Sequence, residues 1–181
     1  QNNSHIGRGL HIHPVINTWG MMPEPIYSRG ATQGHFVDEF KDDRVLLESN
    51  PTIGGAFFQS FPVHGSKGKE LMTKGNQFVS TGALIRDTSE GEVHARKKGT
   101  SKITYNVNEA DRKRLLIGLR KGAQLWLEGA GAEFIVPSIF GAKFCHNMDD
   151  VRKVLPDDLP AKRFINFCSH PQASCRMGRA C

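Results

Sequence analysis

A regular pattern of apolar residues predicts one long helix in the second half of the chain. Between Glu109 and Glu128, apolar side chains recur at spacings of three and four residues, which places them along one side of a helix. Asn108 is a suitable N-terminal cap, and Asp111 lies in the first turn, where the helix dipole favours a carboxylate. Gly129 to Gly131 can end the helix in the left-handed conformation. The stripe consists of Leu115, Leu116, Leu119, Ala123, Trp126 and Leu127. We expect it to brace a sheet by core packing.

Segments with the two-residue periodicity of strands precede and follow this helix. Residues 101–107 alternate so that Ile103, Tyr105 and Val107 share one face. Residues 78–86 and 91–96 predict a hairpin around a turn at 87–90. Further strands are expected at 11–20, 54–61, 134–136 and 164–167, a long loop at 21–43, and a short helix at 149–155. Hairpins followed by a long helix imply an α+β fold, in which the helix covers one face of a mostly antiparallel sheet.

The composition is that of a globular domain with its own core. The chain has 181 residues, of which 38% are hydrophobic and 23% charged, and this excludes a disordered tail. No apolar run is long enough to span a bilayer, and no internal repeat is visible. The net charge of +6 comes from basic clusters with carboxylates close by, which indicates a solvated surface rather than a nucleic-acid interface. The first residues carry neither an initiator methionine nor a leader, so we expect the natural chain to continue, and the compartment stays open.

Cysteine and histidine residues near the end of the chain raise the alternative of a metal-binding domain. Soft ligands are supplied by Cys168, His170, Cys175 and Cys181, and Cys145-His146 could add two more. His11 and His13 would lie on the same face of a predicted strand, an arrangement suited to zinc or copper. The spacings do not match the paired ligands of structural zinc sites, so we assign no metal ligands. A surface strand with outward polar side chains is the simpler interpretation of the histidine pair.

The most specific motif is the string Phe167-Cys168-Ser169-His170-Pro171-Gln172-Ala173-Ser174-Cys175-Arg176-Met177-Gly178. It resembles the active-site histidine segment of the glucose-methanol-choline (GMC) flavoprotein oxidoreductases, whose common form is His-Pro-x-Gly-Thr-x-Arg-Met-Gly. The resemblance implies that His170 is the base that takes a hydroxyl proton while hydride leaves for a flavin. A neutral imidazole suits this task, because its unperturbed pKa lies near working pH. Ala173 and Ser174 stand where Gly-Thr is usual, so the glycine that permits close approach is missing.

Two weaker landmarks extend the resemblance along the chain. Residues 6–15, read as Ile-Gly-Arg-Gly-Leu-His-Ile-His-Pro-Val and followed by Trp19-Gly20, are similar to a segment of the long-chain fatty alcohol oxidase branch. The strand at 101–107, Asp111, the long helix and Gly131-Ala132 look like the strand-helix-strand unit of a GMC substrate domain. The resemblance therefore implies a substrate-domain-like portion at 1–163. It also implies that 164–181 begin the catalytic-histidine segment that returns to the flavin domain.

The resemblance implies part of an FAD-dependent enzyme that oxidises a primary, long-chain aliphatic alcohol. Two expected parts are missing from the sequence: a Gly-x-Gly-x-x-Gly turn after a strand, and the second catalytic position before Asn-Pro. The flavin-binding Rossmann half is thus absent, and FAD would be bound mainly by the remaining portion of the flavoenzyme or by other subunits. The choice between oxidase and dehydrogenase stays open. Phe57, Phe58 and Phe61 could line an apolar substrate channel, although core packing is the commoner use of such residues.

A non-catalytic role is the second alternative. In this hypothesis a GMC-derived fragment serves as a scaffold or interaction subunit of a larger assembly, and His170 is a structural histidine at the end of a strand. The two hypotheses differ in one consequence. Replacing His170 would leave the activity of the assembly unchanged if the fragment is a scaffold.

Overall fold

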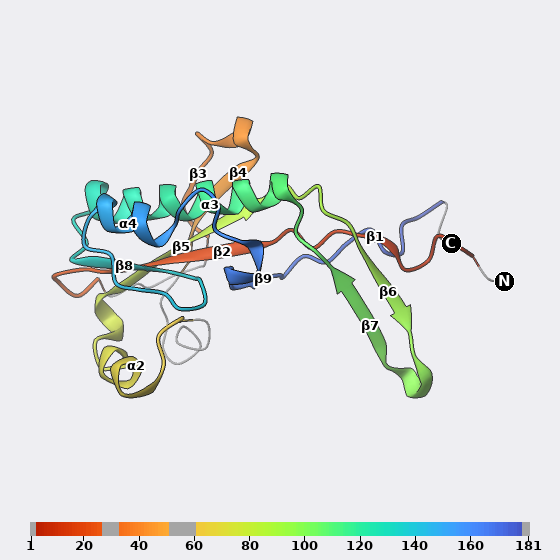
Figure 1. Cartoon of the computed structure of the whole chain (residues 1–181), viewed down its shortest axis with the longest axis horizontal. Coiled ribbons are helices and arrows are strands. Elements are labelled where there is room, and N and C mark those ends of the chain that lie inside the picture. The colour runs from red at the N-terminus through yellow and green to blue at the C-terminus, as the bar shows by residue number, and fades with distance from the viewer. Residues whose placement is uncertain (1–2, 27–32, 51–60, 179–181) are drawn as a thin grey trace.

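The six-stranded sheet at the centre of the fold is antiparallel throughout. The computed structural model describes residues 3–26, 33–50 and 61–178. Its larger sheet has the order β3-β4-β5-β2-β8, and β9 pairs with β2 beside β8 (Figure 1). The strands are β2 (Val15–Met21), β3 (Phe36–Val37), β4 (Val45–Asn50), β5 (Phe78–Ile85), β8 (Phe134–Pro137) and β9 (Asn166–Phe167). The predicted mostly antiparallel sheet is confirmed.

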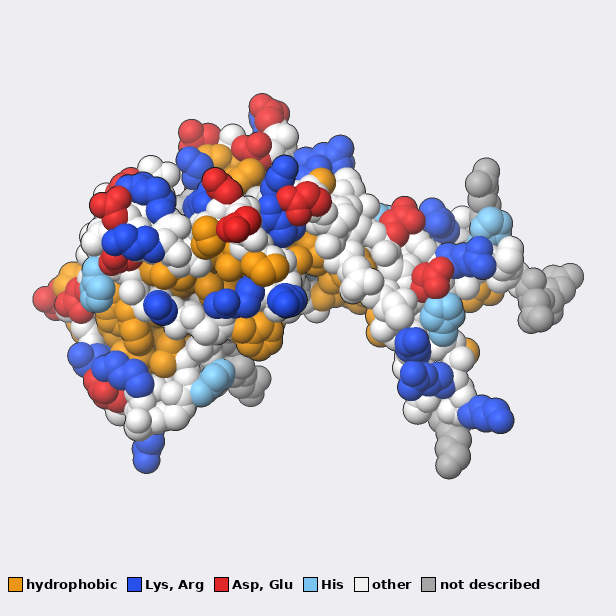
Figure 2. Space-filling view, in the orientation of Figure 1, with side chains coloured by type: hydrophobic (Ala, Val, Ile, Leu, Met, Phe, Trp, Pro, Cys, Tyr) orange, Lys and Arg blue, Asp and Glu red, His pale blue; other side chains and the backbone are white. Residues whose placement is uncertain are grey.

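A smaller, three-stranded sheet projects from this body (Figure 1). It consists of β1 (Arg8–Leu10), β6 (Gly91–Ala95) and β7 (Ser101–Tyr105), with β6 in the middle. The β6–β7 hairpin turns at η3 (Lys97–Gly99) and carries exposed basic side chains near its tip, including Arg96 and Lys102 (Figure 2). Both chain termini lie at this end of the molecule (Figure 1).

The predicted helix forms and lies across one face of the larger sheet (Figure 1). It runs as α3 (Glu109–Gln124) and continues into a π-helical turn, η4 (Leu125–Gly129). The Asn108 side chain caps it by accepting a hydrogen bond from the Asp111 amide at 2.8 Å. Gly131, with φ of +72°, provides the expected left-handed residue after the helix, whereas Gly129 does not adopt a positive φ. Other helical elements are α2 (Gly65–Met72), α4 (Met148–Val154), η1 (Lys41–Asp43), η2 (Gly75–Gln77) and η5 (Ala161–Arg163).

Alternating side chains on the strands build one core on each face of the sheet. The face toward α3 buries Ile16, Ala83 and Ile135 against a part of the helix stripe, with Leu115 and Leu119 fully buried. The opposite face packs Trp19, Met21, Phe61, Phe78 and Val136 against Leu71 of α2. Small residues bring α3 close to the sheet, since a Cβ on Gly118 would lie 2.4 Å from the Ala83 Cβ. Among the described residues, no helix has the length and apolar character needed to cross a membrane.

The predicted hairpin of residues 78–86 with 91–96 is wrong. β5 pairs with β4 and β2 in the larger sheet, whereas β6 pairs with β7 and β1 in the smaller one. Residues 87–90 therefore link two sheets and do not close a turn. The physical reason lies in Asp111, whose carboxylate accepts the backbone N–H groups of Thr88 and Ser89 and so satisfies them outside any strand ladder.

Of the other predicted strands and helices, some are confirmed and some differ from the structure. The strand at 101–107, the strand at 134–136 and the helix at 149–155 are confirmed as β7, β8 and α4 within two residues at each end. The strand expected at 11–20 begins only at Val15, and residues 54–60 lie outside the described part of the chain. β4 and α2 were not predicted. Arg112 belongs to a basic cluster expected on the solvated surface, yet it is 9% exposed and donates to the carbonyls of Asp157 and Leu159.

Candidate active site

Two segments from opposite ends of the chain run side by side and form the site. β2 begins at Val15, which pairs with Phe167 of β9, and an isolated antiparallel bridge joins His11 to Gln172. The His11 amide donates to the Gln172 carbonyl at 3.0 Å, and the Gln172 amide donates to the His11 carbonyl at 2.8 Å. Further out, the Gly7 amide donates to the Ser174 carbonyl at 2.7 Å. We call this arrangement of residues 7–16 against 166–176 the terminal ladder.

The terminal ladder places His13 directly against His170. Both residues lie between two such pairs, His11 with Gln172 and Val15 with Phe167, and the two segments bring them together there. Their Nδ1 atoms lie 3.2 Å apart, within hydrogen-bond distance, and their ring centroids are 5.2 Å apart at an interplanar angle of 40°. His170 is exposed and His13 is half-buried. One ring must therefore donate from Nδ1 while the other accepts there.

The backbone of the terminal ladder is held in unusual conformations beside the histidines. His13 has φ of +50° and Ala173 has φ of +69°, in the left-handed region that L-residues with a Cβ rarely adopt. Gly9 on the facing segment leaves room for the guanidinium of Arg176, because a Cβ there would lie 2.6 Å from Nη2. Strained residues of this kind persist only where the surrounding contacts fix them.

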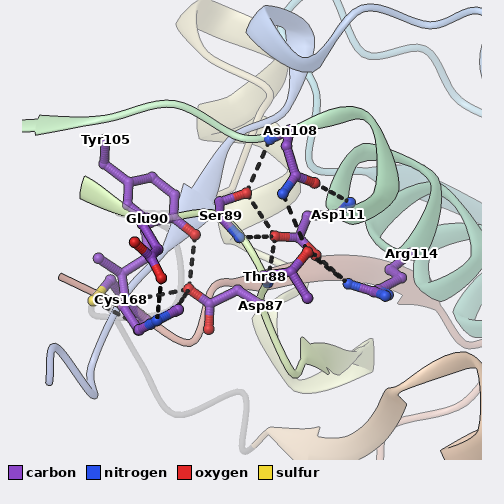
Figure 3. Close-up of polar contacts among 11 residues, drawn as sticks. Asp87, Thr88, Ser89, Glu90, Tyr105, Asn108, Asp111, Arg114 and Cys168 are labelled. Carbon is purple, nitrogen blue, oxygen red and sulfur yellow. Dashed lines mark hydrogen bonds and ion pairs between the residues drawn. The ribbon is translucent and has the colours of Figure 1, made fainter. Parts of the chain in front are cut away.

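A polar network behind the terminal ladder fixes the residue that precedes His13. The Asp87 carboxylate accepts a hydrogen bond from the Ile12 amide at 3.1 Å and another from the Tyr105 hydroxyl at 2.8 Å (Figure 3). Burial, together with this contact to Asp87, raises the pKa of Tyr105, so the phenol stays a donor. On the other side, the Cys168 thiol donates to the Ile12 carbonyl at 3.0 Å. Both polar groups of the Ile12 backbone are thus engaged.

The described residues that were considered as metal ligands do not form one cluster. His11 lies 3.5 Å from Asp87 and 3.8 Å from Glu90, whereas His13 faces His170, so the two histidines contact different groups. They precede β2, and the left-handed turn at His13 breaks the alternation. Among the described residues, no group of three or more His, Cys, Asp or Glu side chains is placed to hold a metal ion.

Of the other candidate residues, Cys145 and Phe61 lie apart from the terminal ladder. Cys145 is buried and bridges to Ile135 of β8, and burial with the nearby charge of Asp150 raises the pKa of its thiol to about 11. Cys175 is exposed, and Cys181 is outside the described residues. Phe61 is 1% exposed and packs edge-on against Trp19 and Phe78, so it serves the core. Phe57 and Phe58 are outside the described residues.

The surface beside His170 carries small side chains and one strongly exposed methionine. Ala173 and Ser174 have small side chains, and Met177, which follows them, is 93% exposed. A hollow of about 390 Å³ adjoins His13 and is lined by His11, His13, Arg86, Asp87, Gln172 and Ala173. The described part of the chain has no glycine-rich strand-to-helix turn that could hold a dinucleotide. Among the described residues, the small side chains of Ala173 and Ser174 are those that would leave room for a flat ring beside His170.

Comparison with known proteins relates the chain to alcohol oxidases. No protein-family model matches it. The long-chain-alcohol oxidase FAO4B of Arabidopsis thaliana is 28% identical over 197 residues, covering 97% of this chain and 26% of that protein. The long-chain-alcohol oxidase FAO1 of the same plant is 36% identical over 143 residues, covering 72% of this chain and 18% of that protein. The chain thus spans about a quarter or less of the relatives it matches. These similarities support a relationship with the GMC-type oxidoreductases.

Proposed function

We propose that this chain supplies the substrate-side wall and the catalytic base, His170, of an FAD-dependent alcohol oxidoreductase of the GMC type. The observation that carries the proposal is the setting of His170. It is an exposed imidazole in a GMC-like string, and the terminal ladder holds it against His13 with 3.2 Å between the Nδ1 atoms.

The task proposed for His170 is removal of the hydroxyl proton of the substrate. Loss of hydride from carbon is much easier from an alkoxide than from a neutral alcohol. The Nδ1 of His170 is engaged by His13, so Nε2 is the nitrogen left to face a substrate. General-base help of this kind typically contributes about two to four orders of magnitude in rate. Pro171 restricts the backbone of His170 and so helps to hold the ring outward.

The proposed substrate is a primary, long-chain aliphatic alcohol. Support comes from the relatives, which are named long-chain-alcohol oxidases, and from residues 6–15 with Trp19-Gly20, which are similar to a segment of that branch. In the structure, that N-terminal segment is the one that pairs with the His170 segment. Both similar motifs therefore meet at one site.

FAD is the proposed cofactor, and when bound it would supply the hydride acceptor. Ala173 and Ser174 would contact it, while most of its binding site would come from the remaining portion of the flavoenzyme or from partner subunits. The high exposure of Met177 and of Ile6, which is 55% exposed, supports a further polypeptide covering this end of the terminal ladder. The same surface would suit a scaffold, so the two hypotheses must be separated by activity.

The test uses the complete flavoprotein that contains these residues. His170→Ala should lower kcat by about two to four orders of magnitude, with the flavin absorbance per protein unchanged. His94→Ala is the matched control, because His94 is exposed on β6, is not part of the terminal ladder and pairs with Glu92. It should retain wild-type turnover. Unchanged turnover in His170→Ala would remove the catalytic assignment and favour the scaffold hypothesis.

A further inference from the structure

We infer that His13 is a positioning residue that selects the tautomer of His170 by accepting a hydrogen bond from its Nδ1–H. The inference rests on the proposed function of His170 and extends it to a second residue. His13 lies 157 positions away in sequence, yet faces His170 across the terminal ladder. It does not need to touch substrate to act.

The contact between His13 and His170 determines which nitrogen of each ring can carry a proton. The short approach joins Nδ1 to Nδ1, so one proton is shared between them and the two rings have opposite roles. If His13 donated, Nδ1 of His170 would be the acceptor and its ring proton would sit on Nε2, the nitrogen that faces outward. His170 would then present a donor to the hydroxyl and could not take its proton there.

The base function therefore requires the other arrangement. His170 carries its proton on Nδ1 and donates it to Nδ1 of His13, which leaves the Nε2 lone pair of His170 free. His13 in turn carries its own proton on Nε2. When His170 takes the hydroxyl proton on Nε2 it becomes an imidazolium, and its Nδ1–H bond to His13 becomes a stronger, charge-assisted one. No other change in the protons of His13 is needed.

The terminal ladder is built to hold His13 in this place. Its φ of +50° turns the ring toward the facing segment, and histidine is among the residues that tolerate this region best. The preceding residue, Ile12, is fixed on both backbone groups, by Asp87 and by Cys168. The next residue, Pro14, is buried and leads directly into β2. His170 is exposed, so the pair divides into a fixed partner and an outward base.

The experiment compares two substitutions that both fit the left-handed backbone, so that strain is not the variable. Glycine adopts φ of +50° without steric strain, so His13→Gly removes only the ring, whereas asparagine also tolerates this region and His13→Asn places an acceptor oxygen near the position of Nδ1. In the complete flavoprotein, His13→Gly should lower kcat about 10-fold or more, as part of the general-base contribution, with KM and flavin content nearly unchanged. His13→Asn should recover most of the loss.

A second readout does not depend on activity. In the flavin-free protein with ¹⁵N-labelled histidine, solid-state NMR should show His170 protonated on Nδ1 and unprotonated on Nε2, with the signal assigned by its absence in His170→Ala. His13→Gly should abolish this preference. The inference is overturned if the His170 proton resides on Nε2 in the wild type, if His13→Gly keeps the wild-type kcat, or if the Asn and Gly variants lose kcat equally. A fully active His170→Ala would instead remove the proposed function, whatever the tautomer.

Discussion

The Asp111 carboxylate, in the first turn of α3, accepts two hydrogen bonds from Ser89 and so fastens the helix to the link between the two sheets. Asp111 Oδ2 lies 2.7 Å from the Ser89 amide nitrogen and 2.6 Å from its hydroxyl, and the Thr88 amide donates to the same oxygen at 2.8 Å (Figure 3). Arg114 completes the set as an ion-pair partner. Burial by itself would raise the pKa of Asp111, but these hydrogen bonds outweigh it and hold the pKa below the ordinary value.

Replacing this carboxylate should destabilise the protein strongly. Asp111→Asn turns one acceptor oxygen into a donor amide in a site where all neighbours donate, so at least one buried N–H or hydroxyl loses its partner. We expect the free energy of unfolding to fall by about 2–4 kcal/mol, measured by chemical denaturation. Asp149→Asn is the control, because Asp149 is also in the first turn of a helix but is exposed, with Arg152 as its partner. Its effect should be below about 1 kcal/mol, and equal losses in both variants would contradict the role given to Asp111.

Because the pKa of Asp111 is lowered, the stability that its carboxylate contributes depends on pH. A group whose pKa is lower in the folded than in the unfolded state adds stability above the unfolded value, about 3.9 for aspartate. That stability is lost as pH falls through the lower, folded value. Wild-type protein should therefore lose more stability than Asp111→Asn when the pH is lowered from neutral to acid, as followed by denaturation at a series of pH values. Parallel curves for the two proteins would count against this account.

Gly118 should not tolerate a methyl group although it lies inside a helix. In the interior of a helix, alanine is more favourable than glycine by about 1 kcal/mol. At Gly118, however, the new Cβ would lie 2.4 Å from the Ala83 Cβ, and α3 would have to move off the sheet. Gly118→Ala should lower the free energy of unfolding by about 1–3 kcal/mol. In the control Gly129→Ala, the new Cβ would make an ordinary contact of 3.8 Å with the Leu125 side chain, so the melting temperature should not drop.

Replacing Ala173 by glycine should stabilise the folded protein. Its φ of +69° costs a residue with a Cβ about 1–2 kcal/mol, which glycine does not incur. Glycine also loses more chain entropy on folding, by roughly 0.5–1 kcal/mol, so the net gain in stability should be about 0.5 kcal/mol. The control is Ala95→Gly, at an exposed site in β6 without a positive φ, where a loss is expected. A melting temperature that falls equally in both variants would mean that Ala173 is not strained.

Cys145 should resist alkylation as long as the protein is folded. Its thiol is fully buried and its pKa is raised to about 11, so at pH 8 very little thiolate is present and reagents cannot reach it. Cys175, which is exposed, serves as the internal comparison. Peptide mapping after brief treatment with iodoacetamide should find Cys145 modified only after denaturant is added. Modification of folded protein at the rate of Cys175 would contradict its burial.

The sequence pattern predicted those elements that depend on contacts between residues close in sequence. The stripe from Leu115 to Ala123, the Asn108 cap and Gly131 were sufficient to predict α3 and its ends, because helix contacts span only three or four residues. β7, β8 and α4 were predicted for the same reason. α2 escaped prediction because Gly65 and Gly68 weaken its helical signal. It is stabilised by tertiary contacts, with Leu71 buried and Gly68 placed where a Cβ would lie 2.5 Å from the Val63 carbonyl oxygen.

The sequence pattern alone was enough to predict α3, β7, β8 and α4, and the motif around His170 suggested this residue as a candidate base. The partners of these elements depend on the tertiary structure. Alternation shows that residues 78–86 and 91–96 are extended, but it does not show that Asp111 binds the backbone of Thr88 and Ser89, or that β5 and β6 belong to different sheets. Likewise, the contact of His13 with His170 was not predicted. Pairing across 157 residues depends on strand register and buried polar contacts, which carry no local signal.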